Sequence, residues 1–313
     1  MTNKNPKRPP GTYRAPSTNG SKEAAAPRPR GLGALLGARP PVDTAMPAIP
    51  AALLRGFVAI VSSPVLLAAI PLFLLVEWLA VVAMGFQGPF SVFTNALAIP
   101  PIGTIFDATI ATGTYGAQAG LLFIVAFVAV RAVVLALLTV GIVQVLDEGK
   151  VSVSAMSRVL RVIPVTLSVG FLNMIIVTLS GVFLQLGGIG FLLQIAGMVL
   201  GVYLFVFAPI MAAVEPRGMT EAMSRSIRAA RIPGAGNLLM SAIYVLPAIA
   251  VLLYSGKPGT LLAVNPTAGQ WVFVLIANLI HLVVLATFAF RYLSIADDVP
   301  DAPPPRSRSQ RRR

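Results

Sequence analysis

The chain has 313 residues, of which 56% are hydrophobic and 11% are charged, and its mean hydropathy is +0.83. A soluble domain typically carries about 25% charged residues, so a chain with this few cannot cover a surface that faces water. The net charge of +13 would suit nucleic acid, but most Lys and Arg residues lie in the tails or flank apolar segments, so no nucleic-acid partner is expected.

The chain divides by composition into two basic tails and an apolar middle. Residues 1–48 are rich in Pro, Arg, Ser and Gly and are predicted to form a disordered N-terminal tail. A signal peptide would place an apolar region directly after a short charged one, and this tail does not. Residues 49–293 are predicted to form the membrane domain, and 294–313 a second disordered basic tail.

Six apolar stretches are long enough, or nearly so, to cross about 30 Å of hydrocarbon. With the N-terminus in the cytoplasm, every Lys and Arg except Arg131 and Lys257 falls in a tail or a cytoplasmic connection, as the positive-inside rule requires. We therefore expect a multi-pass protein of the cytoplasmic (plasma) membrane with both termini inside. The sequence leaves open whether the first outer connection, 87–119, re-enters the bilayer. The predicted spans are Pro64–Phe86, Gly120–Leu146, Pro164–Leu186, Ile189–Val214, Asn237–Tyr254 and Trp271–Arg291.

A short motif recurs before pairs of spans. Ala155–Arg161 and Ala222–Arg228 both begin Ala-Met-Ser-Arg and are followed by a proline, and Ala52–Phe57 is a looser copy. Because Pro64 and Pro164 disfavour helix at the preceding residue, each is expected to end one helix and begin another. The predicted fold is thus an all-α bundle of six transmembrane helices, built as three repeats of an amphipathic cytoplasmic helix and a hairpin. Chance similarity in an Ala-rich chain is the alternative.

Basic residues of these cytoplasmic helices are candidate binding residues. An amphipathic helix lying flat would place Leu, Val and Met in the acyl boundary and Arg toward the headgroups. Anionic lipid headgroups are one possible partner, a cytoplasmic or membrane protein is another, and simple topology is the third interpretation. The candidates are Arg158, Arg161, Arg225, Arg228 and Arg231.

The segment Pro209–Ser226 has a recognisable pattern: a helix end with Pro209, then Glu215, Gly218 and Ala-x-x-Arg225-Ser. It resembles the signature of the membrane domain attached to some bacterial glycerophosphoryl diester phosphodiesterases, which also occurs as a stand-alone membrane protein. The resemblance implies a membrane domain of unknown function. It does not imply phosphodiesterase activity, because the soluble catalytic barrel is absent from this chain.

Two opposite charges lie inside predicted spans. Glu77 and Arg131 are at similar depths in the first and second spans, within about 3 Å at a rise of 1.5 Å per residue. An unpaired charge there costs about 2.5–3.5 kcal/mol, so such charges usually face the bundle interior and pair. The pair is interpreted either as a lock between adjacent helices or as part of a polar pathway.

Further polar residues extend this candidate intramembrane cluster. Asn278 and His281 are three residues apart and share a helix face, and Asn173 is near the middle of the third span. Such residues form midplane sites in transporters, and they also serve as ordinary hydrogen-bonding contacts between helices. The motif Gly197-Met-Val-Leu-Gly201 permits close helix approach within the bundle.

The sequence contains no motif for a nucleotide, a metal or a catalytic nucleophile. There is no cysteine and one histidine, so no zinc site, other cofactor or catalytic residue is predicted. The leading interpretation is a non-enzymatic scaffold or accessory for an envelope, lipid or transport process. The alternative is a permease-like subunit of the ABC-2 kind that works with a separate ATPase, to which the 152–161 helix would couple.

Overall fold

A computed structural model describes residues 47–83, 117–152, 156–232, 234–254, 268–296 and 299. Within this part of the chain every regular element is a helix and none is a strand, so the all-α prediction is confirmed. The tails 1–46 and 300–313 and the connection 84–116 lie outside the described residues. The helices are α2 (Ile49–Val61), α3 (Pro64–Ala83), α5 (Ala117–Glu148), α6 (Met156–Gly181), the 3-10 helix η2 (Val182–Leu186), α7 (Gly188–Phe205), α8 (Phe207–Val214), α9 (Met219–Ala230), α10 (Gly234–Tyr254) and α11 (Ala268–Ile295).

Each of the six predicted spans overlaps at least one of these helices, and several helices are long and apolar enough to cross a membrane. By length and composition, three described segments qualify alone: Ala129–Glu148, Gly188–Val214 and Leu275–Ile295. The bent pair Ile49–Val61 and Pro64–Phe73 would make a fourth. Three or four spans are thus supported directly, and the full set of six stays a prediction.

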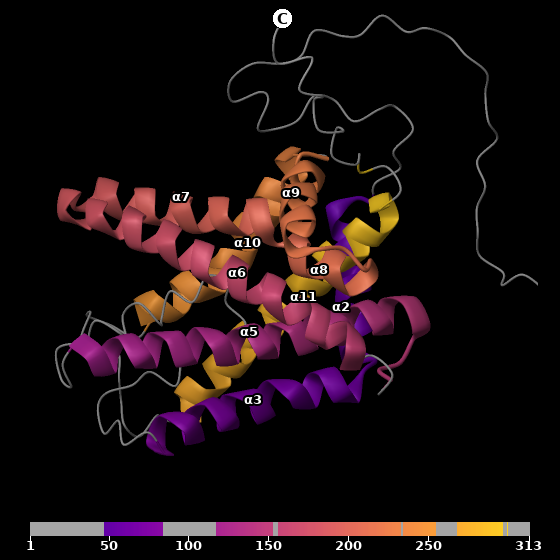
Figure 1. Ribbon diagram of the computed structural model, residues 1–313, viewed down its shortest axis with the longest axis horizontal. Helices are drawn as coiled ribbons and strands as arrows, with labels where there is room; N and C mark the ends of the chain where they lie inside the picture. The colour runs from indigo at the N-terminus through magenta and orange to yellow at the C-terminus, as the bar shows by residue number, and fades with distance from the viewer. Residues whose placement is uncertain are drawn as a thin grey trace, which may run out of the picture.

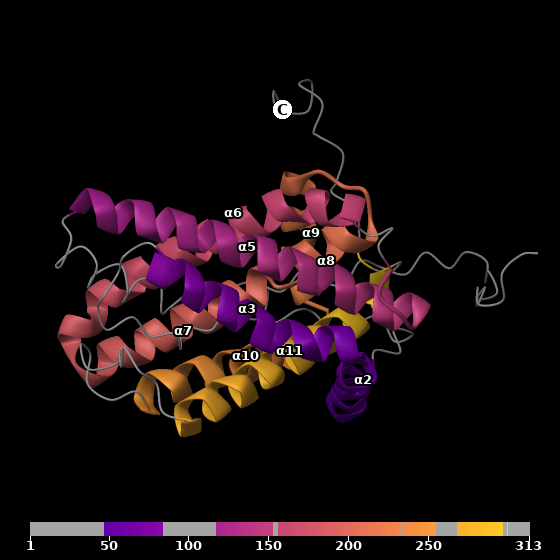
Figure 2. The same ribbon diagram turned by 90° about the horizontal axis from the view of Figure 1, so that it is seen from below.

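Of the long helices, α3, α5, α6 and α7 run lengthwise in the molecule, and α10 and α11 cross at an oblique angle, as Figures 1 and 2 show. The turn between α6 and α7 lies at one end (Figure 1), where Gly187 has a positive φ of 64°. The short helices α2, α8 and α9 gather at the opposite end, beside the C-terminal end of α11 (Figure 1). We call this second end the α9 end.

The predicted break at Pro64 is present. α2 ends at Val61, α3 begins at Pro64, and the two helices meet at an angle of 79°. Proline suits the first helical position because the N–H group it lacks would have no intrahelical partner there. The elbow turns α2 across the bundle (Figures 1 and 2).

The predicted break at Pro164 is wrong. α6 runs without interruption from Met156 to Gly181, with Pro164 inside it. Proline in a helix interior removes the backbone hydrogen bond to the carbonyl group four residues earlier, so contacts from elsewhere must hold the helix continuous. Thr166 Oγ1 lies 2.9 Å from the carbonyl oxygen of Ile163 and 2.9 Å from that of Ala132 on α5, which braces the helix at this point. The segment 156–161 is therefore the beginning of a long helix and not a separate cytoplasmic helix.

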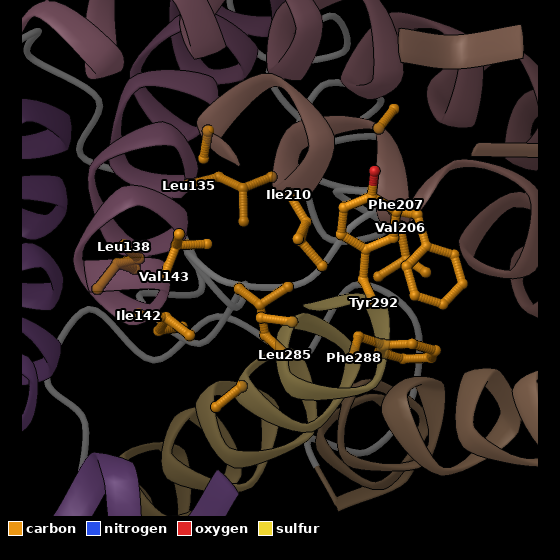
Figure 3. Packing of buried hydrophobic residues seen from close by; sticks show 14 of the residues in the cluster. Leu135, Leu138, Ile142, Val143, Val206, Phe207, Ile210, Leu285, Phe288 and Tyr292 are labelled. Atoms are coloured by element: carbon orange, nitrogen blue, oxygen red, sulfur yellow. The ribbon is translucent and has the colours of Figure 1, made fainter. Parts of the chain in front are cut away.

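The core of the bundle lies where α5, α8 and α11 meet (Figure 3). Leu135 of α5 points toward Ile210 of α8, and Phe207 of α8 packs edge-on against Phe288 of α11 with ring centroids 5.4 Å apart. Aromatic pairs in this geometry stabilise packing beyond the area they bury. This packing holds the short helix α8 between α5 and α11.

Large apolar side chains also lie on the outside of the long helices. Leu179 of α6 is 62% exposed, Leu192 of α7 is 65% exposed, and Val272 of α11 is 54% exposed. Soluble monomers rarely expose extended apolar surface of this kind.

Candidate functional site

Glu215 lies at the point where α8 ends, next to α9 and α11. It is the C-cap of α8 and adopts an extended conformation. The following residue is Pro216, and a residue before proline disfavours the helical region, so the helix must stop here. The stop directs the Glu215 carboxylate into the α9 end of the bundle.

Three donors converge on this carboxylate. Arg225 of α9 donates from Nη1 to Oε2 of Glu215 at 3.1 Å, and the hydroxyl of Tyr292 of α11 donates to Oε1 at 2.9 Å. Arg217 donates to the same carboxylate. Arg225 also donates from Nη2 to the carbonyl oxygen of Ala296 at 2.8 Å. We call Glu215, Arg225 and Tyr292 the inner clamp.

The inner clamp is largely removed from solvent. The side chain of Arg225 is 6% exposed, that of Glu215 is 21% exposed, and Tyr292 is fully buried. Burying a guanidinium is tolerable only when a carboxylate and carbonyl groups replace its water. Because both carboxylate oxygens accept hydrogen bonds, the arrangement suits a structural tie between the α8–α9 connection and the end of α11.

Arg217 extends the clamp toward the surface. It donates to Glu215 and also to Glu221 in the first turn of α9. The hydrogen bonds to Glu215 and, secondly, to Glu221 raise the pKa of Arg217 above its usual value. Its guanidinium therefore keeps its charge at every physiological pH.

A second polar junction surrounds Arg291 of α11, which is 2% exposed. Its Nη1 donates to the carbonyl oxygen of Pro47 at 3.0 Å, and its Nη2 donates to Oδ1 of Asn237 at 3.3 Å. The amide of Asn237 in turn donates to the carbonyl oxygens of Ala230 and Ile232 at 3.0 Å and 3.1 Å. This junction fixes the start of α2 and the passage from α9 to α10 against α11.

The arginines predicted to face lipid or a partner from α9 differ in position. Arg225 does not face outward, because it is buried against Glu215 and the end of α11. The physical reason is that its charge is neutralised inside the protein. Arg228 is half-buried and donates to Ser224 at 3.0 Å, and Arg231 is exposed just after the helix.

The arginines of the earlier motif lie closer to solvent. Arg161 is exposed, and Arg158 pairs with Glu148 at 3.5 Å with about a third of each side chain exposed, 35% and 37%. The partners of this pair are ten residues apart, as are Glu215 and Arg225. In both cases the acid ends a span and the arginine is the fourth residue of the recurring motif.

For the predicted ion pair of Glu77 and Arg131, the structure describes the side chain of Arg131 alone. Arg131 is 5% exposed on α5, and α5 packs against α3. Glu77 lies within α3, but its side chain is outside the described residues. The ion pair therefore stays a prediction.

Asn173 is fully buried on α6, where it faces Gly201 of α7. A Cβ atom at position 201 would collide with the amide oxygen of Asn173. Among the described residues neither amide atom of Asn173 has a hydrogen-bond partner. The GxxxG motif thus lets α7 approach α6 within the chain.

Asn278 and His281 are both buried on α11, at 1% exposure each. The His281 ring packs on Tyr244 of α10 with centroids 4.8 Å apart. Within the described part of the chain its ring nitrogens have no hydrogen-bond partner of standard geometry. His281 thus lies between α10 and α11, whereas Asn173 lies between α6 and α7, and the single polar cluster stays a prediction.

Sequence reasoning singled out neither Glu215 nor Tyr292 nor Arg291 as site residues. Glu215 lies in the segment Pro209–Ser226, between an apolar span and a basic motif, and this position is the sequence feature that could have indicated its role. The dipeptide Arg291-Tyr292 at the end of the last span resembles an ordinary interfacial anchor. Its contacts lie 54 and 77 residues away in the chain, and no local pattern encodes them.

The described residues contain no group of three or more acidic, histidine or cysteine side chains that could hold a metal ion. Comparisons with protein-family models, with curated proteins and with solved structures find no match.

Proposed function

We propose that this chain is an integral membrane protein that crosses the bilayer six times and acts as a non-enzymatic scaffold or accessory for an envelope, lipid or transport process. The observation that carries the proposal is the apolar outer surface of the long helices, on which Leu179, Leu192 and Val272 are more than half exposed. Hydrocarbon is the solvent in which such a surface is stable.

The polar groups support the same orientation. The inner clamp and the Arg291 junction both lie at the α9 end, where α2 begins and α11 ends. The positive-inside rule places this end in the cytoplasm. It would present a rigid, basic platform on which a partner can assemble. The resemblance of Pro209–Ser226 to the phosphodiesterase-associated membrane domain supports the membrane location.

Reporter fusions test the crossing number. A reporter at residue 105 should be active only outside the cell, and one at the C-terminus only in the cytoplasm. If both report the same side of the membrane, the six-span topology is wrong. Release of the protein by alkaline carbonate would contradict the membrane location altogether.

Copurification from gentle detergent tests the scaffold role. We expect a protein partner in stoichiometric amount, and we expect Arg161→Ala with Arg231→Ala to release it, because both side chains are exposed at the α9 end. Arg55→Ala, which changes an exposed arginine on α2, is the matched control. Purification as one species, unchanged by the substitutions, would contradict a protein-binding scaffold.

A second candidate is a permease-like subunit, favoured by the buried polar side chains of Asn173 and His281 inside the spans. Such groups are expensive in hydrocarbon and often mark a substrate pathway. The continuity of α6 removes the separate coupling helix that this candidate would use at 152–161. Copurification of an ATPase, and loss of transport on neutralising Glu77 and Arg131 together, would favour it over the scaffold.

A further inference from the structure

The helix α2 presents four large apolar residues outward and buries mainly small ones. Its buried face consists mainly of small residues that pack against the bundle. Its exposed face follows the spacing i, i+3, i+4, i+7 of a single helical stripe. The buried residues are Ala52, Gly56, Ala59 and Ile60, and the exposed ones are Leu54 (64%), Phe57 (47%), Val58 (47%) and Val61 (47%).

Contacts with α11 hold α2 in this orientation. A Cβ atom at Gly56 would lie 2.6 Å from Oγ1 of Thr287 and 2.9 Å from the carbonyl oxygen of Val283, so only glycine allows this approach. The hydrogen bond from Arg291 to Pro47 fixes the chain just before the helix begins. The outward direction of the apolar stripe is therefore set by the fold.

The orientation of α2 places this stripe at a defined level. α2 meets α3 at 79° and lies across the long axis at the α9 end (Figures 1 and 2). A helix perpendicular to the spans lies parallel to the bilayer surface, where apolar side chains reach about 5–10 Å into the headgroup and acyl boundary. Arg55 is exposed beside the stripe, and Lys150 and Arg161 are exposed at the ends of α5 and α6.

We propose that α2 is an interfacial anchor whose exposed stripe inserts into the inner leaflet, with Arg55 at the level of anionic headgroups. The occupant of this face is lipid, since the stripe is apolar and its flanking charge is positive, opposite to that of the leaflet surface. The related helix α9 does not share the role, because it buries Ala222, Arg225 and Ala229 against the protein. This inference rests on the proposed membrane location.

Site-directed fluorescence tests the proposal on the full chain, which has no native cysteine. Leu54→Cys and Val58→Cys each receive a bimane label in nanodiscs of phosphatidylethanolamine and phosphatidylglycerol. Ile280→Cys, on the outer face of α11, reports the acyl region, and Asp147→Cys, exposed at the end of α5, reports water. All four substitutions change exposed side chains, and monodisperse size-exclusion profiles check the fold.

We expect a doxyl group near the top of the lipid chain to quench positions 54 and 58, and aqueous iodide to quench only position 147. Quenching of 54 and 58 by iodide would show that α2 faces water. Quenching by neither would show that a protein segment, such as a second copy or the N-terminal tail, covers the stripe. Either result overturns the anchor. If Ile280→Cys is also quenched by iodide, the membrane location itself fails.

The headgroup part of the proposal is tested separately. Replacing phosphatidylglycerol with phosphatidylcholine should shift the emission of the label at position 58 to longer wavelength, because the helix loses its attraction to the surface. In an Arg55→Gln background the same exchange should produce no shift. Equal shifts in both backgrounds would remove Arg55 from the binding surface.

Discussion

The inner clamp should contribute to the free energy of unfolding, and substitutions can measure the share of each of its residues. Glu215→Gln keeps the shape of the side chain but removes the charge that faces the buried guanidinium of Arg225. Breaking a fully buried ion pair costs about 3–5 kcal/mol, and breaking an exposed one costs about 0–1 kcal/mol. The two side chains of this pair are 6% and 21% exposed. We therefore expect a loss of about 2–3 kcal/mol in the free energy of unfolding.

Tyr292→Phe removes only the hydroxyl that donates to Glu215 at 2.9 Å. A hydrogen bond to a charged group contributes about 1.5–3 kcal/mol, and the loss should fall in the lower half of that range because the carboxylate keeps its other donors. Arg217→Ala removes the outer donor to the same carboxylate, and its side chain is 26% exposed. It should cost about 0–1 kcal/mol.

Unfolding of the purified protein by sodium dodecyl sulfate, followed by circular dichroism, measures these differences. Combining Glu215→Gln with Arg225→Ala should cost clearly less than the sum of the two single changes, because the double variant buries no unpaired charge. Additive losses, or equal small losses for Glu215→Gln and Arg217→Ala, would refute the clamp as a buried, coupled unit.

Three further predictions concern close packing and the second ion pair. Gly201→Ala should destabilise by about 1–3 kcal/mol in the same assay, and Asn173→Ala should restore much of the loss by removing the amide it meets. Gly56→Ala should also lower the free energy of unfolding by about 1–3 kcal/mol, because its new methyl group would meet Thr287 and rigid backbone. An unchanged unfolding midpoint would contradict the docking of α2 on α11. Arg158→Ala should cost about 0.2–1 kcal/mol and should lose even that effect at high salt, because its ion pair is exposed.

The sequence predicts the six long helices because about 20 consecutive apolar residues leave few alternatives. It does not predict how each proline is used. Pro64 and Pro164 follow similar motifs, yet only the first forms an elbow. Val162 is fully buried and Thr166 braces the helix against α5, so tertiary contacts hold the second helix continuous. Local propensity cannot report such contacts.

Charged residues show the same limit. The prediction that basic residues gather at one end follows from topology, and it does not say which guanidinium is buried. Arg225 and Arg158 occupy the same position of the motif, and one is enclosed while the other is half-exposed. Arg225 is enclosed by Tyr292 and the C-terminal end of α11, which are distant from it in the sequence. In the described part of the chain, contact with the end of α11 distinguishes Arg225 from Arg158.

The shared spacing of the two ion pairs bears on the repeat. Glu148 and Glu215 each end a span, and each pairs with an arginine ten residues later. Similar residues in an Ala-rich motif can arise by chance. The two glutamates lie outside the motif, so their equal distance in sequence from the paired arginine is a separate similarity between the two segments. Nothing in helix geometry demands it, since α6 and α9 differ in length and in burial. The threefold repeat stays a prediction, and the shared spacing agrees with it. Arg225 differs from Arg158 in that it also donates to the carbonyl oxygen of Ala296 at the end of α11.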